Sequence, residues 1–378
     1  MYWLVQSSNN KSLPFTTSIE NGSDHTGEWA YPLGFNIFLI ADTAICVTWS
    51  LLANSIVLIS VLRDPKLHQA QNYYIASLAA SDWMMAAFVM PIALYNFLYK
   101  GWPIRSRALC KFWTFMDFTN SLQSSLSVSL ISYDRYCMVC KPVSYRNSTW
   151  RTAAFRIGAT WTFSILFYGL TIMFWDVVQG YSDVPDNECL VEFEYDMTMS
   201  IIQAILEFLV PLALICYCNV RLWLYIRNRR KKVYRSASFR VVAQSKNDEG
   251  LPVCNMPSKD KRTAIAEFRR EQRTFRNLLI LVGTYFSLWI WYEIISNFVQ
   301  PVLFNFEHRS VSTTVFLAAT WPQYHLHAID PIIYAITIER FRYHFKLAFS
   351  RPFTSCSREP VPTVKSEEGK DSVSQAMP

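Results

Sequence analysis

The sequence predicts an all-α membrane protein, a seven-transmembrane helix bundle followed by a short amphipathic eighth helix. Of its 378 residues, 51% are hydrophobic and only 17% are charged, whereas soluble domains usually carry about a quarter charged residues. The apolar residues gather in blocks of about twenty or more, which is the length of a membrane-crossing helix. The seven blocks lie at about 34–62, 72–98, 107–139, 153–175, 197–226, 273–300 and 312–336.

Loop charges orient this bundle. The segment 227–271 holds thirteen Lys/Arg against five Asp/Glu, and Lys141–Arg151 adds three more basic residues. Both loops are therefore predicted to be cytoplasmic, although the basic loop 98–109 falls on the other side. We expect a multi-pass plasma-membrane protein with an extracellular tail (1–33), the bundle (34–336, third cytoplasmic loop about 227–271), a membrane-surface helix (337–350) and a disordered cytoplasmic tail (351–378).

The tails and cysteines fit this topology. Asn10 and Asn21 are N-glycosylation acceptors in the outer tail. Of nine cysteines, only Cys110 and Cys189 fall on the oxidising side, so the topology predicts a disulfide between them. Cys356 follows the amphipathic segment and is a candidate for palmitoylation, although a plain free thiol is an equally good interpretation.

Several other classes of function are disfavoured. The net charge of +7 belongs to cytoplasmic loops beside anionic lipid, so we do not interpret it as nucleic-acid binding. No metal-ligand spacing or nucleophile–base arrangement indicates an enzyme, since His325 and His327 are two residues apart on a helix and point in different directions. The absence of an internal repeat disfavours a transporter, which stays a remote alternative together with a channel.

Asp117 is the most informative residue. An ionised carboxylate inside a membrane-length helix costs several kcal/mol unless a cation partners it. At about 1.5 Å per residue, Asp117 lies roughly 10 Å from Cys110 and roughly 27 Å from Arg135 along one helix. A second mid-helix carboxylate, Glu207, stands four residues before Pro211. Two buried anions facing one pocket favour a ligand with two positive or hydrogen-donating ends.

Motifs in nearly every segment resemble those of rhodopsin-like (class A) G-protein-coupled receptors. Tyr133-Asp134-Arg135-Tyr136 is similar to the DRY motif that ends the third segment of that family. The other matching motifs are Asn54, Leu78-Ala79-Ala80-Ser81-Asp82, Trp161, Pro211 and Asp330-Pro331-Ile332-Ile333-Tyr334.

The resemblance implies a site for a cationic amine. Asp117 stands where aminergic receptors bind a protonated nitrogen, and the runs 130–136 and 206–211 resemble histamine receptors of the third and fourth subtypes. Histamine, with an amine and an imidazole, would suit Asp117 and Glu207 together. The expected ligand contacts are Asp117, Phe118, Ser121, Glu207, Trp289, Tyr292, Trp321 and Tyr324, with cation–π contacts from the aromatic rings. A class A receptor for a peptide, a lipid or an unrelated amine stays an alternative.

The resemblance also implies a heterotrimeric G protein as partner, with Gi/o suspected, and arrestin and receptor kinases as further partners. Arg135 is expected to pair with Glu271 in the resting state and to meet the G protein on activation. The residues implied in activation are Asp134, Arg135, Tyr136, Glu271, Asp330, Pro331 and Tyr334. No cofactor is expected beyond an allosteric sodium ion in a pocket formed by Asp82, Ser124 and Asp330.

The sequence departs from the family pattern in the sixth and seventh segments. Trp291 replaces the proline that follows Trp289, so we expect a straighter sixth helix. Leu326 and His327 replace an Asn-Ser pair, and Asp330 replaces an asparagine. Asp82 and Asp330 would therefore hold a cation tightly or share a proton. These changes predict unusual activation: high basal activity, weak signalling, or a ligand other than histamine.

The loop 176–196 carries seven carboxylates and no Lys or Arg. Such a field would concentrate cations at the entrance to the bundle. Ordinary solvated surface charge explains the same composition equally well.

Overall fold

The computed structural model describes residues 29–350, except 100, 101, 103, 105, 147, 183, 185–187, 246–257 and 300–311. The predicted glycosylation sites Asn10 and Asn21, the candidate palmitoylation site Cys356 and the tail 351–378 lie outside these residues. Every multi-residue element within the described ranges is a helix, which confirms the predicted fold class.

The helical elements cover all seven predicted segments. In chain order they are α1 (Leu33–Arg63), η1 (Pro65–Leu67), α2 (Ala70–Met84), η2 (Met85–Val89), α3 (Met90–Leu98), α4 (Arg107–Cys140), α5 (Pro142–Tyr145), α6 (Trp150–Gln179), η3 (Glu192–Tyr195), α7 (Met197–Gln203), η4 (Ala204–Leu209), α8 (Val210–Ser245), α9 (Ser258–Ile294), η5 (Ile295–Val299), α11 (Thr313–Thr337) and α12 (Glu339–Ser350). The elements η2, η4 and η5 are π-helical turns. They lie within the second, fifth and sixth segments, so each of those segments combines α-helix with a π-turn.

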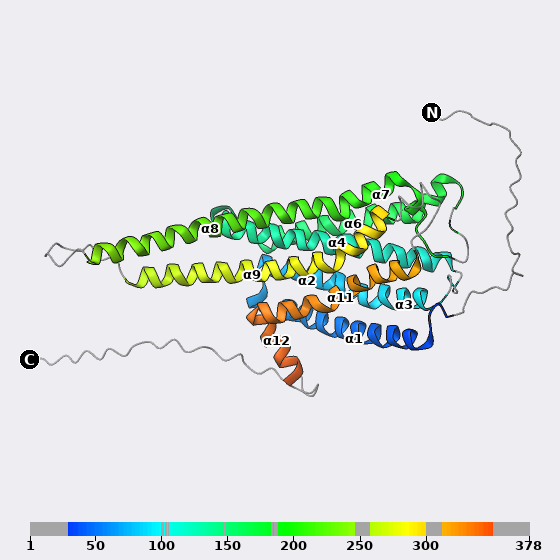
Figure 1. Cartoon of the computed structure of the whole chain (residues 1–378), viewed down its shortest axis with the longest axis horizontal. Coiled ribbons are helices and arrows are strands. Elements are labelled where there is room, and N and C mark those ends of the chain that lie inside the picture. The colour runs from blue at the N-terminus through cyan, green and yellow to red at the C-terminus, as the bar shows by residue number, and fades with distance from the viewer. Residues whose placement is uncertain are drawn as a thin grey trace, which may run out of the picture.

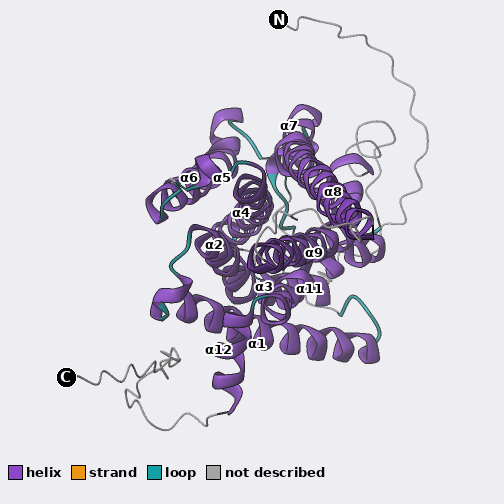
Figure 2. Ribbon diagram, turned by 90° about the vertical axis from the view of Figure 1, so that its left-hand side faces the viewer, coloured by secondary structure: helices purple, strands orange, loops and turns teal. Residues whose placement is uncertain are grey.

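The long helices lie roughly side by side, and α4 is enclosed by its neighbours (Figures 1 and 2). It packs against α2, α6, α8 and α9. Helices α8 and α9 extend well beyond the others at one end (Figure 1). Helix therefore continues to Ser245 and resumes at Ser258, inside the segment 227–271 that the sequence assigns to a loop. The Lys, Arg and Glu residues of that segment are good helix formers.

Five of the described segments are long and apolar enough to cross a membrane: Leu33–Arg63, Ala70–Leu98, Trp150–Gln179, Met197–Lys231 and Glu271–Ile294. The other two long segments, α4 and α11, are richer in polar side chains that are buried within the bundle, including Gln123, Ser124 and Gln323. An interior helix needs no lipid-facing apolar surface, so its own hydropathy is a poor guide to its membrane location.

Buried polar side chains join the central helices. Gln123 of α4 donates to Ser77 of α2 and to Thr160 of α6, each at 3.2 Å. The Trp161 indole donates to the same Ser77 hydroxyl at 3.1 Å. Arg156, a charged residue near the start of α6, donates to the Tyr74 hydroxyl at 3.2 Å. These bonds satisfy polar groups that lipid could not solvate.

A proline in α11 explains the contact with α1. Pro331 has no N–H, so the carbonyl of His327, four residues earlier, lacks its helical partner. Ser50 and Asn54 of α1 donate to that carbonyl at 2.9 and 3.1 Å. Asn54, which matched a family motif in the sequence, thus fixes α1 against this part of α11.

The short helix α12 leaves α11 at an angle (Figure 1). Phe341 and Phe345 are buried, whereas Phe349 is exposed, as expected of an amphipathic helix. His344 Nε2 lies 3.0 Å from Asp64 Oδ2 at the end of α1. Partial burial opposes ionisation of Asp64, but the His344 contact and a backbone bond from Lys66 outweigh it and lower the pKa of that carboxyl.

Candidate functional site

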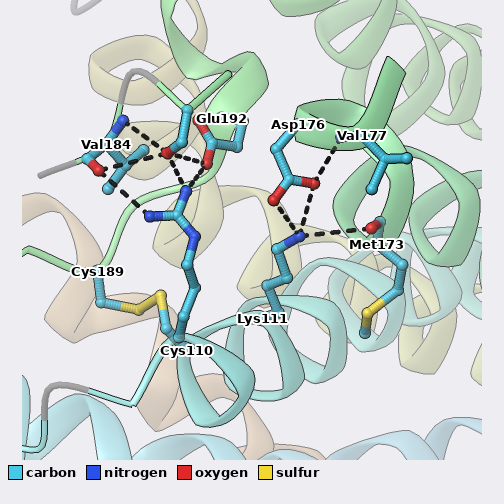
Figure 3. Close-up of polar contacts among 10 residues, drawn as sticks. Cys110, Lys111, Met173, Asp176, Val177, Val184, Cys189 and Glu192 are labelled. Atoms are coloured by element: carbon cyan, nitrogen blue, oxygen red, sulfur yellow. Dashed lines mark hydrogen bonds and ion pairs between the residues drawn. A yellow bond between two sulfur atoms is a disulfide. The ribbon is translucent and has the colours of Figure 1, made fainter. Parts of the chain in front are cut away.

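The end of the bundle where α4 begins is closed by the predicted disulfide, and we call it the disulfide end. Cys110 and Cys189 are bonded. Lys111 contacts Asp176 at 2.7 Å, and Arg107 forms an ion pair with Glu192 (Figure 3). Two of the seven loop carboxylates are therefore paired with bases from α4. These pairs reduce the negative field that the loop composition alone predicts at the entrance to the bundle.

Asp117 lies within the bundle, two turns of α4 below the disulfide. It is half-buried. Within the described part of the chain, no hydrogen bond or ion pair engages its carboxylate. The Asp117 carboxylate lies close enough to Glu207, Tyr292 and Tyr324 to interact with each of them electrostatically. Asp117 is thus accessible in part and lies near three of the residues that the sequence predicts as ligand contacts.

Glu207 is held inside the bundle by the π-turn η4. Its side chain is fully buried, and the Tyr168 hydroxyl donates to its Oε1. Gln203 Nε2 donates to Oε2 at 3.4 Å, and Ser125 of α4 donates to the Glu207 backbone carbonyl at 2.8 Å. A π-turn adds a residue to one helical turn and often redirects side chains at functional sites. Neutral donors therefore stabilise Glu207, and no basic residue contacts it among those described.

Glu293 is a third carboxylate, which the sequence analysis missed. It lies on α9 one turn beyond Trp289, and it is fully buried. Its charge acts on Tyr168 and Tyr292, so it belongs to the same region as Glu207. The rule that singled out Asp117, an acidic residue inside an apolar segment, applies equally to Glu293 and would have found it.

The predicted aromatic residues line this region but differ in what they touch. Phe118 packs against Tyr168, with ring centroids 5.4 Å apart. Trp289 is buried against Tyr285 at 4.8 Å, and Tyr292 meets Phe316 at 6.3 Å. Trp289, Tyr292 and Phe316 belong to one apolar cluster, and Phe118 and Tyr168 belong to another.

Tyr324 and Trp321 occupy the α11 side of the site. Tyr324 is buried, but no hydrogen bond joins its hydroxyl to Asp117 in the structure. The Trp321 ring lies 6.2 Å from Tyr324, while its indole N–H donates to Asp42 of α1 at 2.8 Å. Trp321 therefore links the site to α1.

Ser121 is buried one turn below Asp117 and faces α11. Gln323 Nε2 lies 3.5 Å from its hydroxyl, at the limit of a hydrogen bond. Gln323 was not among the predicted site residues. Its position depends on how α11 is rotated against α4, which the sequence does not specify.

At the opposite end of α4, which we call the Arg135 end, the predicted ion pair is not formed. Glu271 instead forms an ion pair with Arg229 of α8, and Arg135 donates to Gln71 of α2. Helices α8 and α9 run beside each other here, which brings Arg229 to Glu271. The prediction of an Arg135–Glu271 contact was therefore wrong for this structure.

The other predicted activation residues at this end are buried and packed. Tyr145 donates to Asp134 Oδ2 at 3.2 Å. Burial and the nearby Asp134 charge raise the pKa of Tyr145, which keeps it a neutral donor. Tyr136 packs on Tyr217 at 6.1 Å, and Tyr334 on Phe341 at 6.3 Å.

The predicted sodium pocket contains an imidazole. His327 Nδ1 lies 2.8 Å from Asp82 Oδ1, and both side chains are almost completely buried. Ser124 bonds to Ser81 at 2.8 Å. Asp82 Oδ2 and Asp330 Oδ1 have no hydrogen-bond partner among the described residues. The pocket thus contains two carboxylates and one imidazole, Asp82, Asp330 and His327. These three side chains could hold a shared proton at least as well as they could coordinate a sodium ion.

Trp291 faces outward from α9, with 59% of its surface exposed. The helix continues without interruption past Trp291 to Ile294, where the π-turn η5 follows. The α-helix thus runs unbroken past the position of the missing proline, and the straighter sixth helix stays a prediction.

A family model described as "7 transmembrane receptor (rhodopsin family)" matches residues 53–334. The octopamine receptor beta-2R of Chilo suppressalis is 26% identical over 360 residues, covering 91% of this chain and 87% of that receptor.

Two muscarinic acetylcholine receptors also match. The receptor DM1 of Drosophila melanogaster is 31% identical over 203 residues, covering 53% of this chain and 25% of that receptor. The receptor M5 of Saimiri boliviensis boliviensis is 30% identical over 187 residues, covering 49% of this chain and 35% of that receptor. These matches span about a quarter to a third of the two muscarinic proteins. None of the three names refers to histamine, so the resemblance to histamine subtypes stays a prediction.

Proposed function

This chain belongs to the rhodopsin family of seven-transmembrane receptors, and from that premise we propose that it binds a small cationic amine and transmits binding to a heterotrimeric G protein. The observation that carries the proposal is the Asp117 carboxylate. It lies inside the bundle, half-buried, with no hydrogen bond or ion pair from any described residue. An anion in that setting is stabilised most by a cation that enters from outside.

The surroundings of Asp117 support a cation over a neutral ligand. Glu207 and Glu293 add two further buried carboxylates, and the walls are aromatic. Aromatic faces attract a desolvated cation by about 2 kcal/mol. The relatives named as acetylcholine and octopamine receptors carry names of ligands with a cationic nitrogen, which agrees with this chemistry.

We propose a histamine-like ligand as the finer assignment. The amine end would pair with Asp117, and a donor on the opposite end would reach Glu207. The Tyr168 hydroxyl and Gln203 already donate to Glu207, so the ligand must share or displace one of these bonds. A monoamine with no second donor would use Asp117 alone.

On the Arg135 end we propose the contact with the G protein, with Gi/o as the suspected class and with arrestin and receptor kinases as later partners. This end would face the cytoplasm of a cell whose plasma membrane holds the receptor, with the N-terminus outside. Signalling then requires that Arg135 exchange its bond to Gln71 for the G protein.

In the pocket of Asp82 and Asp330 we propose a shared proton in place of the family's sodium ion. His327 is bonded to Asp82, and the Ser124 hydroxyl is engaged with Ser81. One proton on this group of three offsets part of the buried negative charge.

A G-protein dissociation screen over histamine, acetylcholine and octopamine tests the proposal in cells that express the full chain. At least one amine should activate, and Asp117→Asn should lower its potency by about a hundredfold or more, the usual loss when a buried charge partner is removed. Asp176→Asn is the matched control, because Asp176 is paired with Lys111 at the disulfide end. An equal loss in both variants, or activation only by neutral compounds, would contradict an amine site at Asp117.

A further inference from the structure

A second group of ligating side chains lies where α1 meets α11, outside the proposed amine site. Asp42 and Cys46 are one helical turn apart on α1 and share a face. His325 approaches them from α11. One ligand atom from each of the three residues lies within 4.8 Å of the others. The sequence analysis found no metal-ligand spacing, because this group combines residues nearly three hundred positions apart.

The orientation of His325 makes one of its ring nitrogens available to a cation. Nδ1 lies 2.9 Å from the Trp321 carbonyl oxygen, which accepts hydrogen bonds only, so Nδ1 carries a proton. Nε2 then faces the two Asp42 oxygens at 3.2 and 3.4 Å. A nitrogen lone pair would repel a carboxylate at that distance. Either Nε2 carries a second proton, or a cation lies between the two groups.

The third side chain favours the cation. Cys46 is buried beside this pair, and a thiolate together with an imidazole is the donor set that zinc and related metals prefer over calcium or magnesium. Tetrahedral zinc places its ligand atoms about 3.3–3.6 Å apart, given bonds of about 2.0–2.3 Å. The 3.4 Å between His325 Nε2 and Asp42 Oδ1 already lies within this range. Small side-chain rotations would bring the sulfur atom into range and leave a fourth position for water.

Bonds from surrounding groups orient the ligands, as in established metal sites. The Trp321 indole N–H donates to Asp42 Oδ2 at 2.8 Å, and the Trp321 carbonyl accepts from His325. Metal-ligating histidines typically donate their other ring N–H to a carbonyl or a carboxylate in this way. One residue thus fixes both ligands before a metal arrives.

We propose that Asp42, Cys46 and His325 bind a divalent cation of the zinc class and thereby tie α1 to α11. The binding claim does not depend on the identity of the amine. The Trp321 ring also packs on Tyr324, which interacts electrostatically with Asp117. If the proposed amine site is functional, metal binding therefore alters the affinity for the amine.

Zinc titration of the purified full-length receptor in lipid nanodiscs, against a fluorescent zinc chelator, tests the binding directly. The wild type should bind one zinc ion at this site. Cys46→Ser and His325→Asn should each weaken that binding at least tenfold, the scale seen when even outer groups of a metal site are removed. Cys216→Ser is the matched control, since it removes an exposed free thiol of α8. Equal zinc affinity in all four proteins would overturn the proposal.

Two measurements on the wild-type protein keep the test decisive if a variant fails to fold. Cobalt substitution should give sulfur-to-metal charge-transfer absorption with tetrahedral bands, which an ion pair without metal cannot produce. Zinc should also protect Cys46, but not Cys216, from alkylation by a maleimide. Unchanged labelling of Cys46 together with no cobalt–sulfur absorption would show that His325 and Asp42 form only an ion pair.

Discussion

Asp117 and the charged residues at the Arg135 end of α4 differ in whether the protein itself supplies a partner for the charge. Near the disulfide end, Asp117 has no ion-pair or hydrogen-bond partner from the described residues. At the Arg135 end each principal charge is bonded to another helix or loop: Arg135 to Gln71, Asp134 to Tyr145, and Glu271 to Arg229.

This difference distinguishes a binding site from a switch. A ligand site gains most from a charge that the protein leaves uncompensated, because the ligand then supplies the missing partner. A switch needs partners that can be exchanged between two states of similar free energy. The predictions below test whether the two ends of α4 really divide these roles.

The largest effect is expected at the second carboxylate of the site. Glu207→Gln should weaken histamine binding by about tenfold to a hundredfold, since hydrogen bonds to charged groups contribute about 1.5–3 kcal/mol. Phenethylamine, which has no second donor, should lose less than about threefold by the same measure. Competition binding with both compounds gives the comparison. Equal losses would mean that Glu207 shapes the helix and does not contact the ligand.

Sodium should change agonist affinity through the Asp82 pocket only after His327 has been replaced. With His327 beside Asp82, agonist affinity should stay constant when potassium is exchanged for sodium at fixed ionic strength. His327→Ser removes the internal base and should let sodium lower agonist affinity about fivefold, a typical coupling between two sites. Strong sodium sensitivity of the wild type would refute the shared-proton proposal.

At the Arg135 end a double-mutant cycle should reveal which residue Glu271 couples to. Glu271→Ala should raise basal G-protein activation by at most about fivefold, because partly exposed ion pairs contribute about 0.2–1 kcal/mol. Arg229→Ala should have a similar effect that does not add to the first. If Glu271 instead couples to Arg135 and not to Arg229, the resting state differs from this structure.

The smallest expected effect concerns the sixth segment. Trp291→Pro should raise agonist-stimulated signalling by about twofold, since proline would remove a helical hydrogen bond and add a kink. Trp291 faces outward, so the substitution removes little internal packing. Concentration–response curves at matched surface expression measure the change. An unaltered maximum would show that the missing kink does not limit activation.

The sequence predicts well whatever depends on one segment at a time. The Cys110–Cys189 disulfide and the placement of Asp117 inside a long helix follow from topology and motif position. Glu293 was equally predictable from its segment and was overlooked.

Contacts between segments were not predictable in the same way. The His327–Asp82, Arg229–Glu271 and His325–Asp42 pairs each join two helices. They depend on how one helix is rotated and shifted against another, and periodicity within a single helix carries no information about that. The π-turn at Glu207 was equally unpredictable from its own segment. Glu207 is held there by hydrogen bonds from Tyr168 and Ser125, which lie on other helices.

The most direct test removes the charge from the ligand and from Asp117, separately and together, and compares the resulting changes in affinity. Binding of the activating amine and of its neutral carbon isostere would be measured on wild type and on Asp117→Asn. The wild type should prefer the cation by about a hundredfold, and the preference should nearly vanish in the variant, because the coupling arises from one buried ion pair. A preference of the same size in both proteins would contradict Asp117 as the group that recognises the cation.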